Sequence, residues 1–141
     1  MNPDEKQVRR RLTLQWIEKA ESDLEAAEYL LSRKPPLFYQ ACFFSQQSAE
    51  KFLKGLLTHK QIEFRKTHDL GELLDLVARF DEALAAKLSF ATKLNPYGVD
   101  IRYPGEMPEP DSGESEMALR CAQKVRDAVI DVLRADDVIY I

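Results

Sequence analysis

Residues 38–60 read FYQACFFSQQSAEKFLKGLLTHK, and this stretch is the strongest indication of the fold that we expect. Its apolar side chains recur every three or four residues, which is the period of an α-helix with one buried face. Polar side chains recur at the same spacing beside that face, and they are Gln47, Glu50, Lys51 and Lys54. The stretch therefore predicts a long helix that carries a polar face next to an apolar one.

Other parts of the chain have the same helical periodicity. They are residues 13–32, 70–80, 82–94 and a last stretch that begins after Asp111 or Ser112. Pro35–Pro36 end the first of these helices, because proline disfavours helix in the residue before it. An irregular loop is expected over 96–112. We therefore expect a single all-α domain over 1–141, an antiparallel up-and-down bundle of four main helices plus a short one.

Composition sets limits on what this protein is. The chain has 141 residues, a formal net charge of −4 and 45% hydrophobic residues, which together exclude disorder as its main state. No apolar run is long enough to cross a membrane, and residues 1–11 lack the apolar core of a secretory signal. The two cysteines make no disulfide framework. We therefore expect a cytoplasmic protein without a membrane partner.

Few residues have the spacing of a known catalytic or metal-binding motif. The two histidines, His59 and His68, have no metal-ligand spacing between them or with cysteine. No G-x-S-x-G motif is present, and the five glycines are scattered rather than gathered in a phosphate-binding loop. We therefore expect no metal and no cofactor.

A set of polar residues remains that suits phosphate or base recognition. Cations neutralise phosphates, while amides and rings recognise bases. The set comprises Gln47, Lys51, Lys54, Lys66, His68, Arg102 and Tyr103, with Asp23 and Glu50 as structural partners. Each has an ordinary alternative explanation, since Glu50 and Lys54 also suit a surface i,i+4 pair and residues 67–69 suit a helix start.

Four blocks of this sequence occur together in one known family. Trp16, Lys19-Ala20, Asp23-Leu24 and Ala27 resemble its W-x-x-K-A-x-x-D-L-x-x-A opening. Residues 43–54, FFSQQSAEKFLK, resemble its F-x-x-Q-Q-A-A-E-K-x-x-K helix. Residues 66–70, KTHDL, and Asn95 with Arg102-Tyr103-Pro104 resemble the remaining two blocks. The chain thus resembles the HEPN domain family (higher eukaryotes and prokaryotes nucleotide-binding), in its small prokaryotic form.

The resemblance implies a helical bundle that commonly forms homodimers and often works with a minimal nucleotidyltransferase in toxin–antitoxin or stress-response modules. Some members are metal-independent ribonucleases with an R-x(4–6)-H motif, and others bind nucleotides or support a partner without catalysis. Here the positions that would hold histidine after Arg102 carry Met107, Pro108 and Glu109. The resemblance therefore favours a binding module in which Lys51, Lys54, Lys66 and Arg102 meet phosphates, Gln47 and His68 donate hydrogen bonds, and Tyr103 stacks.

Two alternatives stay open. The first is a metal-independent ribonuclease that uses His68 and Arg102 from separate segments, because a histidine suits acid–base work. The second is a purely structural dimerisation unit in which Asp23 takes Lys54 or Arg102 as its partner, since a half-buried carboxylate needs a cation. Phe43, Phe44 and the tail 136–141 are candidate dimer surfaces.

Overall fold

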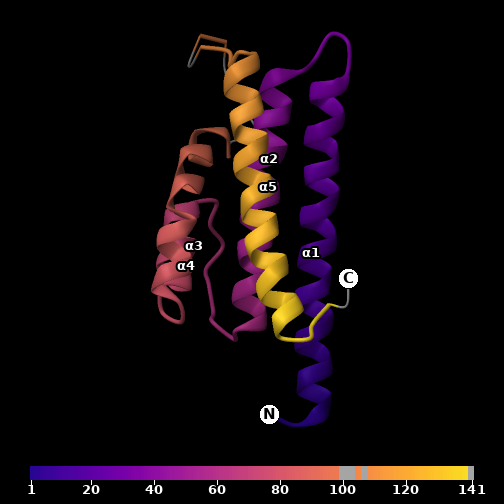
Figure 1. Ribbon diagram of the computed structural model, residues 1–141, viewed down its shortest axis with the longest axis vertical. Coiled ribbons are helices and arrows are strands. Elements are labelled where there is room, and N and C mark those ends of the chain that lie inside the picture. The colour runs from indigo at the N-terminus through magenta and orange to yellow at the C-terminus, as the bar shows by residue number, and fades with distance from the viewer. Residues whose placement is uncertain (99–103, 106–107, 140–141) are drawn as a thin grey trace.

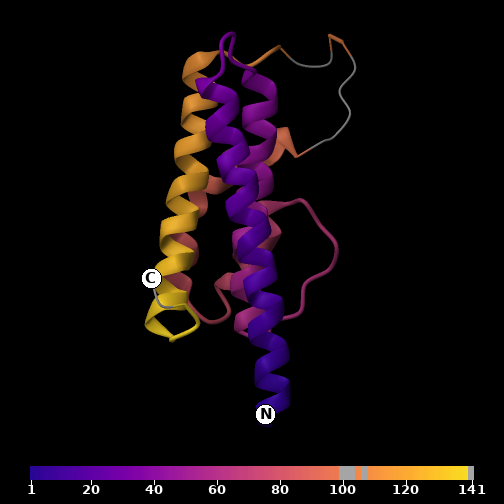
Figure 2. The same ribbon diagram turned by 90° about the vertical axis from the view of Figure 1, so that its right-hand side faces the viewer.

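The computed structural model describes residues 1–98, 104–105 and 108–139. Three long helices lie side by side: α1 (Pro3–Ser32), α2 (Phe38–His59) and α5 (Ser112–Ala135). Between α2 and α5 the chain returns through α3 (Leu70–Val77), α4 (Glu82–Lys87) and the 3₁₀ helix η1 (Ser89–Tyr97) (Figures 1 and 2). Of these, η1 packs against both α2 and α5, α3 packs against α2, and α4 packs against α3 and η1. Every regular element in the described residues is a helix, which confirms the predicted all-α bundle.

The first helix is longer at its beginning than its periodicity predicted. It starts at Pro3 rather than near residue 13, because Asn2 caps it by accepting a hydrogen bond from the Glu5 backbone N–H at 2.9 Å. Pro3 suits a first helical position, and the acidic residues of the first turn face the positive end of the helix dipole. The apolar stripe reveals only the part of α1 that is buried.

The fourth member of the bundle is broken into short pieces. The third helix spans only eight residues, and the segment expected over 82–94 divides into α4 and η1. Pro96 lies inside η1 rather than at the start of the loop, because its ring holds φ near a helical value and the Gly98 N–H closes the turn on the Asn95 carbonyl at 3.1 Å. The helical part of this segment therefore extends to Tyr97, and residues 99–103 and 106–107 of the expected loop lie outside the described residues.

The core is organised around α2, which packs against α1, α5, α3 and η1. Its side chains Phe52, Leu53, Leu56 and Leu57 are completely buried. Gly55 lets α1 approach closely, since a Cβ there would lie 3.0 Å from the Ile17 side chain. Neither cysteine forms a disulfide, and burial raises the pKa of the Cys121 thiol. In the described residues no helix is both long and apolar enough to span a membrane.

Candidate functional site

A buried carboxylate lies at the centre of the polar face of α2. The Glu50 side chain is only 4% exposed, and one of its oxygens, Oε2, accepts a hydrogen bond from Lys54 Nζ at 2.8 Å. The Lys54 side chain is 8% exposed, and its ammonium lies 5.7 Å from the ring of Trp16 and 5.8 Å from that of Phe64. The rings complement the ammonium through their negative faces, while Glu50 neutralises it.

The second oxygen of Glu50 orients a histidine toward solvent. His68 Nδ1 lies 2.8 Å from Glu50 Oε1, although the imidazole is 68% exposed. Glu50 accepts from the Lys54 ammonium and is an acceptor-only carboxylate, so Nδ1 carries the proton and donates it to Oε1. This arrangement leaves Nε2 at the exposed end of the ring. A carboxylate behind an imidazole fixes its tautomer and orientation, as acid–base and anion-binding sites require.

The backbone that carries His68 is held by its neighbours in the chain. Asp69 caps α3 by accepting from the Gly71 N–H at 2.9 Å, and Thr67 Oγ1 accepts from the Asp69 N–H at 3.1 Å. Asn95, at the end of η1, accepts from the Leu70 N–H at 2.9 Å and donates to the Asp69 carboxylate at 3.1 Å. Residues 67–70 and Asn95, distant in sequence, therefore form one support for His68.

Gln46 connects this support to the buried carboxylate. Its Nε2 donates to the His68 carbonyl at 3.1 Å and lies 3.2 Å from Glu50 Oε1, while its own Oε1 accepts from Gln47 Nε2 at 2.6 Å. The side chain is completely buried. Gln46 was not among the site residues that we expected, although its position one turn before Glu50 on the same helix face is a signal that could have found it.

The sequence model of the HEPN domain matches residues 13–133, which is most of the chain. The chain belongs to the HEPN family. The sequence of ST0689, an archaeal HEPN homologue, is 29% identical to that of this HEPN domain. Its crystal structure matches this one with a TM-score of 0.67, and the match covers 86% of this chain and 97% of ST0689. TT1696 from Thermus thermophilus is 30% identical, with a TM-score of 0.67 over 84% and 96% of the two chains. No curated protein matches the chain.

The three lysines that were expected to meet phosphates differ in burial and in their ion-pair partners. Lys51 Nζ lies 2.5 Å from the Asp23 carboxylate of α1, so Asp23 is paired with Lys51 rather than with Lys54. Lys54 lies inside the protein and is engaged by Glu50. Lys66 is exposed and makes no ion pair with any other described residue. Of the lysines expected to meet phosphates, Lys66 is therefore the one with an available charge.

Two of the expected site residues, Arg102 and Tyr103, lie outside the described residues. Gly98 is the last described residue before this gap, and it lies against the Gln46 side chain, which hydrogen-bonds to Glu50 and to the His68 carbonyl. A Cβ on Gly98 would lie 3.2 Å from Gln46 Cδ and from Gln46 Nε2. Gly98 therefore lies directly beside the Gln46 side chain.

Proposed function

We propose that this HEPN domain binds a phosphate-bearing ligand, a nucleotide or RNA, at the exposed edge of His68 and serves as the binding module of a two-protein system. The observation that carries this proposal is the Glu50–His68 hydrogen bond of 2.8 Å, which orients an exposed imidazole from a buried anchor. A protonated imidazole held in this way would donate its Nε2–H to a phosphate oxygen. Lys66, two residues before His68, supplies a second charge.

Of the other site residues expected from the sequence, some stabilise the fold and some would contact the ligand. Glu50 and Lys54 act as the internal anchor, and the Asp23–Lys51 pair ties α1 to α2. Gln47 holds Gln46 in place and acts on the ligand only through that contact. Arg102 would add a guanidinium fork for phosphate and Tyr103 a ring for a base.

Calorimetric titration with ATP, GTP and a short single-stranded RNA tests the binding proposal. We expect one of these to bind the wild type, and His68→Ala and Lys66→Ala each to weaken that binding about tenfold, the loss typical of one charge-assisted hydrogen bond. Lys34→Ala is the matched control, because Lys34 is exposed in the connection between α1 and α2. Absence of binding by the wild type, or equal effects of all three variants, contradicts the proposal.

We further propose that the second protein is a minimal nucleotidyltransferase and that the pair acts in a toxin–antitoxin or stress-type system. Membership of the family supports this proposal. Co-expression with the nucleotidyltransferase of a neighbouring gene should yield a complex that co-elutes in gel filtration. Separate elution of the two proteins at micromolar concentration contradicts it.

A metal-independent ribonuclease is the second candidate, and the same Glu50–His68 pair favours it. An oriented imidazole can take the proton of an RNA 2′-hydroxyl while that oxygen attacks the adjacent phosphorus. The candidate predicts cleavage of single-stranded RNA in the presence of a chelator, with loss of cleavage in His68→Ala. Cleavage that persists in His68→Ala would come from another site or a contaminant, and no cleavage by the wild type leaves binding as the function.

The purely structural alternative rests on the internal pairs of the polar face. It predicts that Asp23→Ala destabilises the fold, because Lys51 loses its partner, and that no nucleotide or RNA binds the wild type. The binding proposal also expects Asp23→Ala to be destabilised, because the Asp23–Lys51 pair ties α1 to α2. The titrations above therefore separate the two: binding of ATP, GTP or RNA by the wild type contradicts the purely structural alternative.

A further inference from the structure

Trp16, the one tryptophan of the chain, connects the polar network to the protein surface. The Lys54 ammonium lies 5.7 Å from the centre of its ring, and the Phe64 ring meets it edge to face at 6.1 Å between ring centres. Trp16 is nevertheless only partly buried, and it lines a small pocket on the surface of α1. The same residue therefore borders both the buried Glu50–Lys54 pair and a space that a ligand can enter.

The pocket combines one aromatic ring with two unused polar groups. It has a volume of about 210 Å³ and is lined by Leu12, Gln15, Trp16 and Lys19. This is smaller than the roughly 300–1,000 Å³ that enclose a whole drug-sized ligand, so the pocket suits one ring system whose substituents extend outside it. Gln15 and Lys19 are exposed, and within the described part of the chain neither side chain makes a hydrogen bond or an ion pair.

These groups suit a nucleobase. The flat face of a base stacks on a tryptophan ring, and the edge of a base has both donors and acceptors of hydrogen bonds. The Gln15 amide offers a donor and an acceptor to that edge, whereas the Lys19 ammonium only donates. A cationic ring would be repelled by Lys19, and no carboxylate lines the pocket to attract it.

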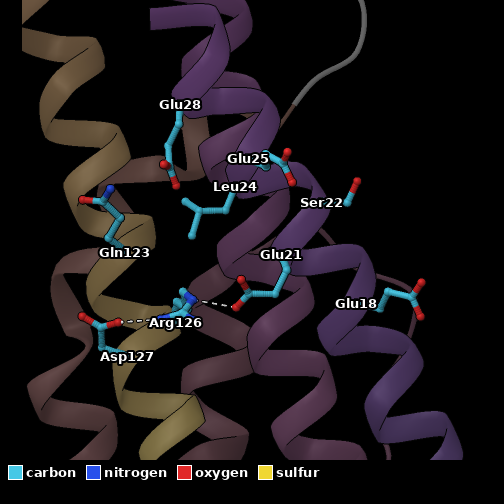
Figure 3. A pocket seen from close by; sticks show the side chains of 9 residues that line it. All are labelled: Glu18, Glu21, Ser22, Leu24, Glu25, Glu28, Gln123, Arg126 and Asp127. Carbon is cyan, nitrogen blue, oxygen red and sulfur yellow. Dashed lines mark hydrogen bonds and ion pairs between the residues drawn. The ribbon is translucent and has the colours of Figure 1, made fainter. Parts of the chain in front are cut away.

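A larger pocket, of about 710 Å³, does not suit the same ligand. It lies between α1 and α5, and Figure 3 shows the charged side chains that line it: Glu18, Glu21, Glu25, Glu28, Arg126 and Asp127. Arg126 lies 2.6 Å from the Glu21 carboxylate, which neutralises its charge. The carboxylates that remain would repel the phosphates of a nucleotide. The smaller pocket beside Trp16 is therefore the better candidate.

We propose that the pocket beside Trp16 binds the base of the ligand whose phosphate contacts Lys66 and His68. This inference rests on the proposed function and adds a second subsite to it. One segment joins the two subsites, because Phe64 contacts Trp16 and is followed by Lys66 and His68 two and four residues later. The ligand is then a nucleotide, alone or as a unit of RNA, that is held at both its base and its phosphate.

Fluorescence makes the test direct, because the tryptophan emission of this chain comes from Trp16 alone. The ligands to titrate are the four common ribonucleoside triphosphates and tripolyphosphate, which has the phosphates without a base. We expect at least one nucleoside triphosphate to quench the emission and to bind about tenfold more tightly than tripolyphosphate in calorimetry, since one base stacks on an aromatic ring. Tripolyphosphate should bind without quenching.

Leu12→Asp places a carboxylate at the wall of the pocket, and Val8→Asp is its matched control. The two side chains are 44% and 43% exposed and lie one helical turn apart, but only Leu12 lines the pocket. Leu12→Asp should weaken binding of the nucleoside triphosphate about tenfold and leave tripolyphosphate binding close to that of Val8→Asp. Val8→Asp should bind the nucleoside triphosphate as the wild type does.

The outcomes distinguish the two subsites. Equal affinities for tripolyphosphate and every nucleoside triphosphate, without quenching, overturn the base subsite and leave the phosphate site standing. Equal effects of Leu12→Asp and Val8→Asp on nucleotide binding also overturn the base subsite. Quenching by a nucleotide that binds His68→Ala as tightly as the wild type supports the base subsite and contradicts the proposed function. Absence of binding by every ligand contradicts both.

Discussion

Replacing Lys54 by methionine removes the ammonium that faces the buried carboxylate of Glu50. The two side chains are 8% and 4% exposed, and their charged atoms lie 2.8 Å apart. Methionine keeps the length and packing of the lysine stem between the rings of Trp16 and Phe64 but supplies no charge. Among the described residues, Glu50 would then keep Gln46 and His68 as its side-chain donors. Breaking a buried pair from one side costs about 3–5 kcal/mol.

That cost converts into a large shift of the melting temperature. For 141 residues, an unfolding entropy of about 2.1 cal/mol/K per residue gives about 0.3 kcal/mol/K, so the loss corresponds to about 10–17 °C. Thermal unfolding followed by circular dichroism measures the shift. The double variant Glu50→Leu/Lys54→Met should lie within about 2 kcal/mol of the wild type, because an apolar pair carries no desolvation cost. It should nevertheless bind ligand poorly, since His68 loses its anchor.

The control is Lys51→Met, whose partner Asp23 is less deeply buried than Glu50 and reaches more solvent. Its loss of stability should be clearly smaller than that of Lys54→Met. Melting of Lys54→Met within about 3 °C of the wild type, a shift that corresponds to about 1 kcal/mol, would contradict the expected cost of the unpaired carboxylate. The loss of stability in Glu50→Leu/Lys54→Met should also be smaller than the summed losses of the single variants Glu50→Leu and Lys54→Met. Equality of the two would contradict the prediction, because the Glu50–Lys54 pair would then carry no coupling energy.

Three further predictions concern other parts of the bundle. Gly55→Ala should destabilise by about 1–3 kcal/mol, measured by urea unfolding, because its methyl group would press on α1 at 3.0 Å. Asp69→Ala should cost about 1 kcal/mol through loss of the α3 cap and should also weaken ligand binding, since the same residue holds the support of His68. The hydrogen bonds from His59 and Lys60 lower the pKa of Asp136 below its ordinary value of 3.8. That contribution to stability is present above the unfolded pKa and is lost as pH falls through the lower folded pKa. The difference in melting temperature between wild type and Asp136→Asn should therefore be present at neutral pH and vanish once the pH falls below the lowered pKa of Asp136 in the folded protein.

Much of the helical framework could be predicted from periodicity alone. The stripe of residues 38–60 gives the position of α2 because a buried helix repeats its apolar residues every three or four positions. Periodicity missed the first turns of α1, residues 3–12, because they have no buried apolar face that would repeat. It also joined α4 and η1 into one helix, since local periodicity does not distinguish an α-helical turn from a 3₁₀ turn.

The candidate site could be predicted less completely. His68 and Glu50 were each selected as polar residues in helix and loop blocks, but nothing in their spacing indicates that they touch. Their contact depends on how the connector from α2 to α3 folds back along α2, and that path is set by Asn95 and Asp69. Gln46, which joins the two, was not among the expected site residues, although its place one turn before Glu50 on the same helix face could have indicated it.

The order of residues was enough to establish that this protein is a helical bundle, which residues form its apolar faces and which polar residues merit a functional hypothesis. These are local properties, since helix period and side-chain chemistry are written in neighbouring residues. The packing of the folded chain was needed to show that Lys51 pairs with Asp23, that Lys54 is buried against Glu50, and that Lys66 keeps an available charge. Ion pairing depends on distance and desolvation, and both arise only when α1, α2 and the connector pack together.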